Sequence, residues 1–320
     1  MLSQKTDGGG TSGRIPYIQL STGLNYEEIL SRIDSDAQVI IYTYSIYGDQ
    51  DYFVRCLGRL NNCRVVINSI SPSMLETLTK LLPNIQFEVR NDTHAKIILI
   101  APDDVYLSSQ NFSVPDWFQH SVHIKDKDAF SFYHKTICLF EERNKPNNIK
   151  QSMYLPYDGK SIFPSSNRGH YVPDYAGIVC TNIKGKYASS VNWNQKLNNV
   201  RNRKIYICTQ TLPDRSYIVT ILTKLFKEGN KVFIIANSES DARLAELKQQ
   251  FPPLLYYIYN NIHAKMVFFS SENPHNEATV WLSSQNFGSS GWFENLIMLK
   301  SNDVYKYYLD KLCAFTGIDL

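Results

Sequence analysis

The chain has 320 residues, of which 43% are hydrophobic and 20% charged, the balance of a soluble globular protein with one large domain or two fused ones. Its six cysteines form no CxxC pair and no Cys/His cluster with zinc-ligand spacing, so a reduced intracellular protein, cytoplasmic or nuclear, is expected. The opening residues lack the apolar core of a signal peptide, and no apolar run reaches the roughly 18 residues of a membrane span.

The predicted elements follow one another in two similar series. Residues 1–13 are expected to be a disordered tail, and residues 14–145 form a first repeat. Apolar, β-branched runs predict strands there, and amphipathic stretches between them predict helices. The predicted strands are 38–46, 64–70, 95–101 and 105–110, and the predicted helices are 51–60 and 71–82.

The segment 146–200 joins this repeat to a second one. It is rich in Asn, Pro, Gly, Ser and Tyr, and the stretch from Lys150 to Lys204 carries nine Lys or Arg against two acids. A net charge of +7 in one segment, when the whole chain carries +3, indicates either an anion-binding surface or a solvated connector. Residues 201–320 then repeat the series, at strand 204–212, helix 216–229, strand 231–238, helix 240–251, and strands 264–270 and 279–285.

The two series are an internal duplication. THAKIILI, from Thr93, matches IHAKMVFF, from Ile262, and LSSQNFSVPDWFQ, from Leu107, matches LSSQNFGSSGWFE, from Leu282. The offset is 169 residues for the first pair and 175 for the second, with turn-rich residues accommodating the difference. We therefore expect an α/β fold of two tandem repeats, each a mixed β-sheet flanked by helices, related by a pseudo-two-fold with one active site between them.

Each repeat carries a His and a Lys two residues apart, namely His94 with Lys96 and His263 with Lys265. On a strand, this spacing places both side chains on one face. The asparagines of the two SSQN blocks, Asn111 and Asn286, end a neighbouring strand and are expected to reach the same place.

Two histidines, two lysines and two asparagines suit phosphodiester cleavage. One imidazole attacks phosphorus, and the other protonates the leaving oxygen and then activates water. The lysines and amides stabilise charge on the phosphate oxygens, so neither a metal nor another cofactor is required. Such a site would be complete within one chain.

These motifs resemble those of the phospholipase D superfamily, whose signature is HxK, four residues, Asp, and a GSxN-like block. The Asp position holds Ala101 in one repeat and Ser270 in the other, as in the tyrosyl-DNA phosphodiesterases. Trp117 and Trp292, each six residues after an Asn, also resemble that branch, as does Gln119. The resemblance implies two phospholipase-D-like repeats, a role in DNA repair, and His94 as the nucleophile with His263 as the general acid.

Further residues are candidates for supporting roles. Ser109 and Ser284 either bond phosphate oxygens or brace the turn. Gln119 is a further supporting candidate, and its equivalent Glu294 is a candidate for orienting a catalytic histidine. The two tryptophans are expected to pack in the core beneath the site. Histidines outside the repeated motifs, such as His120, are expected to be incidental.

The expected partner is nucleic acid, most simply DNA. Aromatic and basic residues interleave in the middle segment, as in surfaces that stack bases and follow a phosphate backbone, and the candidate substrate-binding residues are Lys184, Lys186, Arg168 and Tyr187. The alternatives are a phospholipase or transphosphatidylase with the same chemistry, a sequence-specific restriction-type nuclease, and a non-catalytic binding protein that retains the fold.

Overall fold

The computed structural model describes residues 17–114, 117–142, 150–156, 175–181, 192–212, 215–270 and 278–320. At 17, 150–156 and 175–181 the description covers the backbone only. The predicted tail and the four candidate substrate-binding residues lie outside the described residues.

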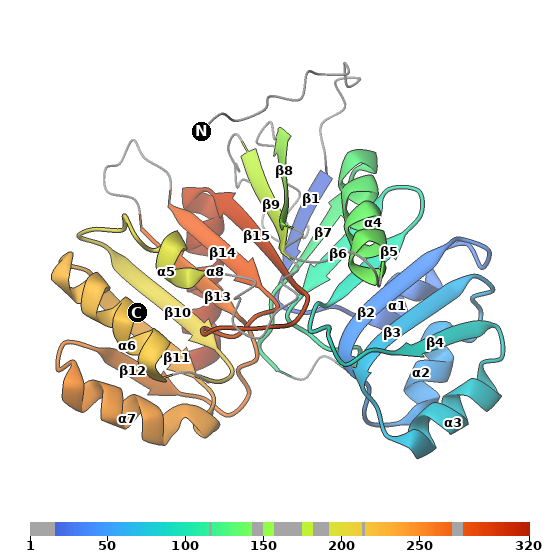
Figure 1. Ribbon diagram of the computed structural model, residues 1–320, viewed down its shortest axis with the longest axis horizontal. Helices are drawn as coiled ribbons and strands as arrows, with labels where there is room; N and C mark the ends of the chain where they lie inside the picture. Colours follow the sequence, from blue (N-terminus) through green and yellow to red (C-terminus); the bar gives the residue numbers. More distant parts are fainter. Residues whose placement is uncertain are drawn as a thin grey trace.

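The first repeat forms a seven-stranded mixed sheet in the order β1-β7-β6-β5-β2-β3-β4 (Figure 1). Strands β2, β3 and β4 are parallel, and the others pair antiparallel. The strands are β1 (Tyr17–Ser21), β2 (Val39–Ser45), β3 (Cys63–Ser69), β4 (Ile85–Val89), β5 (Ile97–Ile100), β6 (Asp104–Ser108) and β7 (Ser121–Lys125).

The second repeat forms an eight-stranded sheet in the order β12-β11-β10-β13-β14-β15-β9-β8. Strand β9 pairs antiparallel with β15 as β1 does with β7, so part of the segment predicted as a connector completes this sheet. The strands are β8 (Lys150–Pro156), β9 (Tyr175–Thr181), β10 (Lys204–Thr209), β11 (Lys231–Ala236), β12 (Leu255–Ile258), β13 (Met266–Phe269), β14 (Thr279–Ser283) and β15 (Glu294–Lys300). The two sheets confirm the predicted α/β fold of two repeats.

Helices pack on both faces of the sheets, which is why strands such as β2 and β14 are buried almost throughout. One apolar cluster joins the first sheet to α1–α3, and another joins the second sheet to α5–α7. A third, central cluster contains residues of both sheets together with α4 and α8. The helices are α1 (Tyr26–Ser31), α2 (Gln50–Leu57), α3 (Pro72–Leu81), α4 (Lys127–Glu141), α5 (Trp193–Lys196), α6 (Arg215–Lys227), α7 (Asp241–Gln250) and α8 (Asn302–Thr316), with a short 3-10 turn, η1 (Ser238–Ser240).

Equivalent residues begin the two central helices. The Asp126 carboxylate accepts from the backbone N–H of Ala129 at the start of α4, and the Ser301 hydroxyl accepts from that of Val304 at the start of α8. Such caps satisfy backbone donors that the first helical turn leaves unpaired. Helix α6 ends at Lys227, and Gly229 follows it with φ +74°, a conformation that favours glycine.

Two pairs of phenylalanines bind the repeats together. Phe293 stacks on Phe140 of α4, with ring centroids 4.5 Å apart, and Phe118 stacks on Phe315 of α8 at 4.9 Å. These pairs are equivalent at the 175-residue offset, so the packing follows the predicted pseudo-two-fold symmetry. Of the helices in the described part of the chain, none has the length and hydrophobicity that crossing a bilayer requires.

Candidate active site

Both His–Lys pairs lie directly before a strand rather than on it. Strand β5 begins at Ile97, one residue after Lys96, and β13 begins at Met266, one residue after Lys265. The prediction that the pairs are on a strand was therefore wrong by a few residues. All four side chains are nonetheless buried, at 1–8% exposure.

The backbone explains why the strands start late. The His94 N–H donates to the carbonyl of Phe293 at 2.9 Å, and the His263 N–H donates to that of Phe118 at 3.0 Å. Each histidine thus pairs with the opposite repeat instead of with the neighbouring strand of its own sheet. Two parallel bridges, Thr93 with Phe293 and Phe118 with Ile262, mark the same exchange. The site is consequently built at the junction of the repeats.

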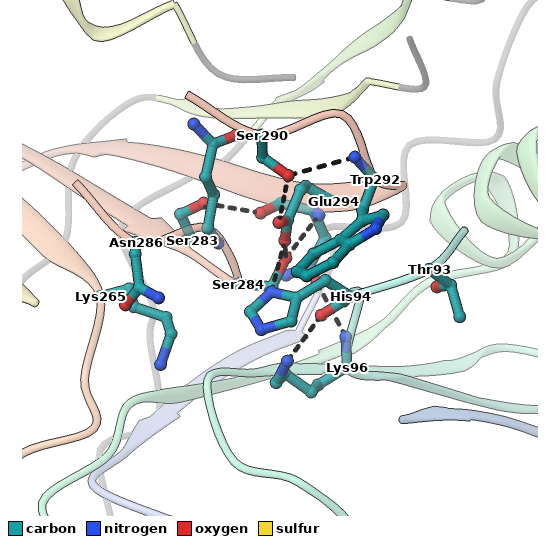
Figure 2. A network of polar contacts seen from close by, with 12 residues as sticks. Thr93, His94, Lys96, Lys265, Ser283, Ser284, Asn286, Ser290, Trp292 and Glu294 are labelled. Carbon is teal, nitrogen blue, oxygen red and sulfur yellow. Dashed lines mark hydrogen bonds and ion pairs between the residues drawn. The ribbon is translucent and has the colours of Figure 1, made fainter. Parts of the chain in front are cut away.

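The imidazole of His94 is held by a carboxylate from the second repeat. Nδ1 of His94 lies 3.1 Å from Oε2 of Glu294, which is 1% exposed and also accepts hydrogen bonds from the hydroxyls of Ser284 and Ser290 (Figure 2). Burial alone would raise the pKa of Glu294, but His94 and Lys96 hold it below its usual value. The carboxylate is therefore ionised, and Nδ1–H of His94 donates to it, which leaves the Nε2 lone pair for chemistry.

The imidazole of His263 is held by an amide from the first repeat. Nδ1 of His263 lies 2.9 Å from Oε1 of Gln119, and the Ser109 hydroxyl donates to the same oxygen at 2.9 Å. Lys265 Nζ is 3.2 Å from this Nδ1, but its hydrogen bond goes to the His263 carbonyl at 2.7 Å. The sequence made Glu294 a candidate for orienting a histidine. The structure adds that Gln119 contacts a histidine in the same way, and that each of the two contacts the histidine of the other repeat.

The two lysines are buried, and few opposite charges lie near them. Lys96 Nζ donates to the His94 carbonyl at 2.6 Å, and its side chain is 1% exposed, as is that of Lys265. Burial lowers the pKa of Lys96 to about 7, although the charge of Glu294 opposes this, and it lowers that of Lys265 well below its usual value, with Lys96 adding to the effect. An empty site of this kind favours an anion.

The same environment sets the protonation of the histidines. Burial lowers the pKa of His94 to about 4, against the opposing charge of Glu294 and with help from Lys96. Burial and the positive charges of Lys265 and Lys96 lower the pKa of His263 well below its usual range. Both imidazoles are therefore neutral at pH 7 in the unliganded site.

The two asparagines differ in how they are held. Oδ1 of Asn286 accepts from the Thr209 hydroxyl at 3.3 Å and the Thr211 N–H at 3.4 Å. Oδ1 of Asn111 is buried and accepts no hydrogen bond from a described residue. Figure 2 shows Lys265 and Asn286 on one side of the site, with His94 and Lys96 on the other. In the second repeat, the Asn286 amide is therefore held through its oxygen, and its Nδ2 hydrogens can donate to a ligand.

The prediction that both tryptophans pack in the core was wrong for Trp292. This indole is 40% exposed and stacks on His94, with ring centroids 5.5 Å apart. Trp117 is partly buried and meets His263 edge-on at 5.8 Å. In both cases the tryptophan belongs to one repeat and the histidine to the other, because each Trp stands two residues before the side chain that holds that histidine.

His120 was predicted to be incidental, but it lies within the junction. It is 1% exposed, and its Nε2 lies 2.8 Å from the carbonyl of Ser283 in the second repeat. Burial lowers its pKa to about 3, so the neutral ring donates through Nε2. Its equivalent, Asn295, accepts from the Lys96 N–H through Oδ1 at 3.2 Å. The 175-residue offset makes these two positions equivalent, and this equivalence was the one feature of the sequence that could have indicated a role for His120.

No group of three or more His, Cys, Asp or Glu side chains suited to a metal ion occurs in the described part of the chain. At the site itself, Glu294 is a carboxylate surrounded by two lysines and bonded to His94, an arrangement that suits an anion better than a divalent cation.

The sequence matches no protein-family model and no curated protein. Solved structures do match. Phosphatidylserine synthase from Haemophilus influenzae is 11% identical and aligns over 92% of this chain and 84% of its own, with a TM-score of 0.59. Polyphosphate kinase from Porphyromonas gingivalis is 10% identical and aligns over 92% of this chain, with a TM-score of 0.54. The chain spans 46% of the length of that kinase.

A phospholipase D family member, Nuc from Salmonella typhimurium, aligns over 40% of this chain and 93% of its own at 13% identity, with a TM-score of 0.30. At these identities a likeness concerns the fold. The two alignments that cover 92% of this chain agree with the two mixed sheets on one architecture. The chain has the fold of two tandem phospholipase-D-like repeats.

Proposed function

We propose that this protein is a phosphodiesterase that acts through a phosphohistidine intermediate, requires no metal, and has DNA as its substrate. The observation that carries the proposal is the convergence of two buried His–Lys pairs, one from each repeat, with each imidazole fixed through Nδ1 so that Nε2 serves the reaction. This arrangement supplies a nucleophile, a proton donor and positive charge around one phosphorus atom.

His94 is the nucleophile in this scheme. Its Nε2 lone pair forms a bond to phosphorus, and the P–O bond to the leaving group breaks on the opposite side. Positive charge develops on the imidazole as the N–P bond forms, and the Glu294 carboxylate, 3.1 Å from Nδ1, stabilises it. Gln119 provides no such charge to His263, so the two histidines are not equivalent.

His263 transfers the proton. Burial and the nearby lysines lower its pKa. The negative charge of a bound phosphodiester has the opposite effect, and it raises this pKa so that Nε2 can be protonated. That proton passes to the leaving oxygen in the first step. In the second step His263 removes a proton from water, the water oxygen attacks phosphorus, and the N–P bond breaks to restore His94.

Lys96 and Lys265, together with the pinned amide of Asn286, stabilise the non-bridging oxygens in both steps. The positive charge that a metal would otherwise supply comes from these side chains. The names of the two structural neighbours, a kinase of polyphosphate and a synthase of phosphatidylserine, fit phosphoryl or phosphatidyl transfer as the general chemistry of such a site.

The choice of DNA is supported by the net charge of +7 between Lys150 and Lys204. Lys184, Lys186, Arg168 and Tyr187 are the proposed contacts, and end processing of the tyrosyl-DNA phosphodiesterase type is the proposed reaction. A lipid phosphodiester is the second candidate, because the synthase of the same fold is named for a phospholipid.

One experiment tests the proposal. Purified protein is incubated in EDTA with single-stranded DNA, duplex DNA, 3′-tyrosyl DNA and phosphatidylcholine vesicles. We expect cleavage of a DNA substrate, which His94→Ala abolishes. Loss of activity on chelation with recovery in Mg²⁺ would refute the mechanism, and cleavage of the vesicle lipid alone would replace DNA by a lipid substrate.

A further inference from the structure

Trp292 lies beside His94, the residue proposed to bind the reacting phosphate, and it is 40% exposed. Its ring stacks on His94 with an interplanar angle of 29°, and it also contacts Tyr44, whose centroid is 5.7 Å away. Tyr44 in turn meets His94 edge-on at 4.8 Å, and Lys96 Nζ lies 5.4 Å from its ring. An exposed indole and a half-buried phenol thus form a wall beside the imidazole (Figure 2 shows Trp292 and His94).

The wall occurs on one side of the pseudo-two-fold axis only. The Thr43 hydroxyl accepts from the backbone N–H of Phe112, and the Thr209 hydroxyl accepts from that of Phe287; these phenylalanines directly follow the two SSQN blocks. The two threonines are therefore equivalent, and so are the residues after them, Tyr44 and Gln210. On the His263 side, an amide therefore replaces the phenol, and Trp117 meets the imidazole edge-on at 67° rather than stacking. A site whose two sides differ in this way suits a substrate whose two sides differ.

The wall flanks the reaction axis. The leaving group departs from phosphorus on the side away from His94, toward His263. Trp292 packs against the ring face of His94, so it lies beside this axis and next to the substituents that stay on phosphorus. A group stacked on Trp292 would therefore remain attached while the leaving group departs.

We infer that Trp292 and Tyr44 form a stacking subsite for a nucleobase, that of the nucleoside which stays on the phosphate bound to His94. The inference rests on the proposed phosphohistidine chemistry and narrows its substrate to a nucleotide. A flat aromatic surface next to Lys96 fits a ligand that joins a planar ring to an anionic phosphate. An acyl chain gains nothing specific from ring stacking.

The test uses two esters with the same leaving group, 4-nitrophenolate. One is thymidine 4-nitrophenyl phosphate, made as both its 3′ and its 5′ ester, and the other is methyl 4-nitrophenyl phosphate, which retains no ring. The readout is the ratio of kcat/KM for the better thymidine ester to that for the methyl ester. Because both esters undergo the same chemistry, the ratio cancels any effect of a variant on His94 itself.

We expect Trp292→Ala to lower this ratio by about 5- to 150-fold, the range that corresponds to stacking of one base. Trp292→Phe, which keeps a ring, should retain most of the ratio. Trp117→Ala, the same change at the equivalent position, should retain it as well, and thermal unfolding of each variant verifies that it is folded.

The outcomes separate the inference from the function on which it rests. Hydrolysis of both esters by the unmodified protein, with a ratio that Trp292→Ala leaves within twofold, would overturn the subsite and leave the phosphodiesterase in place. An equal loss with Trp117→Ala would also overturn it, because the asymmetry would then be absent. Hydrolysis of neither ester would overturn the phosphodiesterase itself, and the subsite with it.

Discussion

Replacing Glu294 by Gln removes one charge from the site and little else. The two side chains have nearly the same shape, and the equivalent position of the first repeat already holds Gln119 beside a histidine. The amide keeps a hydrogen bond to Nδ1 of His94 but cannot neutralise positive charge on the ring. Since the charge of Glu294 raises the pKa of His94, the variant should lower that pKa further below about 4 and weaken the nucleophile.

The expected magnitude follows from the burial of the pair. The Nδ1–Oε2 distance is 3.1 Å and Glu294 is 1% exposed, so solvent screens the interaction little. A hydrogen bond to a buried charged group contributes about 1.5–3 kcal/mol. With about 1.36 kcal/mol for each factor of ten in rate, formation of the phosphohistidine should slow by about 10- to 150-fold.

The assay is the burst of 4-nitrophenolate released by a stoichiometric amount of bis-4-nitrophenyl phosphate, which reports the first step alone. Ser290→Ala serves as a graded comparison, because it removes the 2.9 Å hydrogen bond to Oε1 of Glu294 but keeps the charge, and its effect should be smaller. A burst in Glu294→Gln within twofold of the unmodified protein, with unchanged thermal stability, would refute the role of this carboxylate.

Three further results are expected. Binding of tungstate, an anion that does not titrate near pH 7, should be accompanied at pH 8 by uptake of one to two protons by the protein, because burial holds the pKa of Lys96 near 7 and lowers that of Lys265, and a bound anion raises both. The affinity for tungstate therefore falls as pH rises above 7, and calorimetry in buffers of different ionisation enthalpy that showed no proton uptake would contradict this. Phe293→Ala should lower the free energy of unfolding in urea by about 3–5 kcal/mol, because this fully buried ring stacks on Phe140 between the repeats, and a loss below 1 kcal/mol would argue against that packing. In His94→Ala, neutralising Lys184 and Lys186 together should reduce the slope of log affinity for DNA against log salt by up to about two units, and coincident slopes would make the segment a connector.

Much of the fold could be predicted from the sequence because the duplication displays each pattern twice. The strand at 38–46 and the helix at 71–82 are found as β2 and α3, and their counterparts in the second repeat are found as β10 and α7. Continuous apolar runs identify the strands because both faces of each sheet are covered, and apolar residues at helical spacing identify the helices.

The contacts across the junction could not be predicted in the same way. The spacing of the motifs shows that His94 belongs to the first repeat and Glu294 to the second. It does not show that the two side chains are in contact, because this contact depends on how the two sheets pack against each other. The exposure of Trp292 has the same cause, since large aromatic side chains are more often buried and only the packed junction leaves this one open. The sequence shows that His120 and Asn295 occupy equivalent positions. Because the two side chains differ chemically, the sequence does not show that each one contacts the other repeat.

The central claim is a covalent bond between His94 and phosphorus, and His263→Ala is the variant that exposes it. With bis-4-nitrophenyl phosphate the leaving group needs no proton, so the first step proceeds without His263. The second step lacks its base, so the adduct should accumulate. An acid-labile 4-nitrophenyl phosphoryl group mapped by mass spectrometry to the peptide that contains His94 is the predicted result. Continued turnover of His263→Ala with no phosphate on either histidine peptide would contradict covalent catalysis.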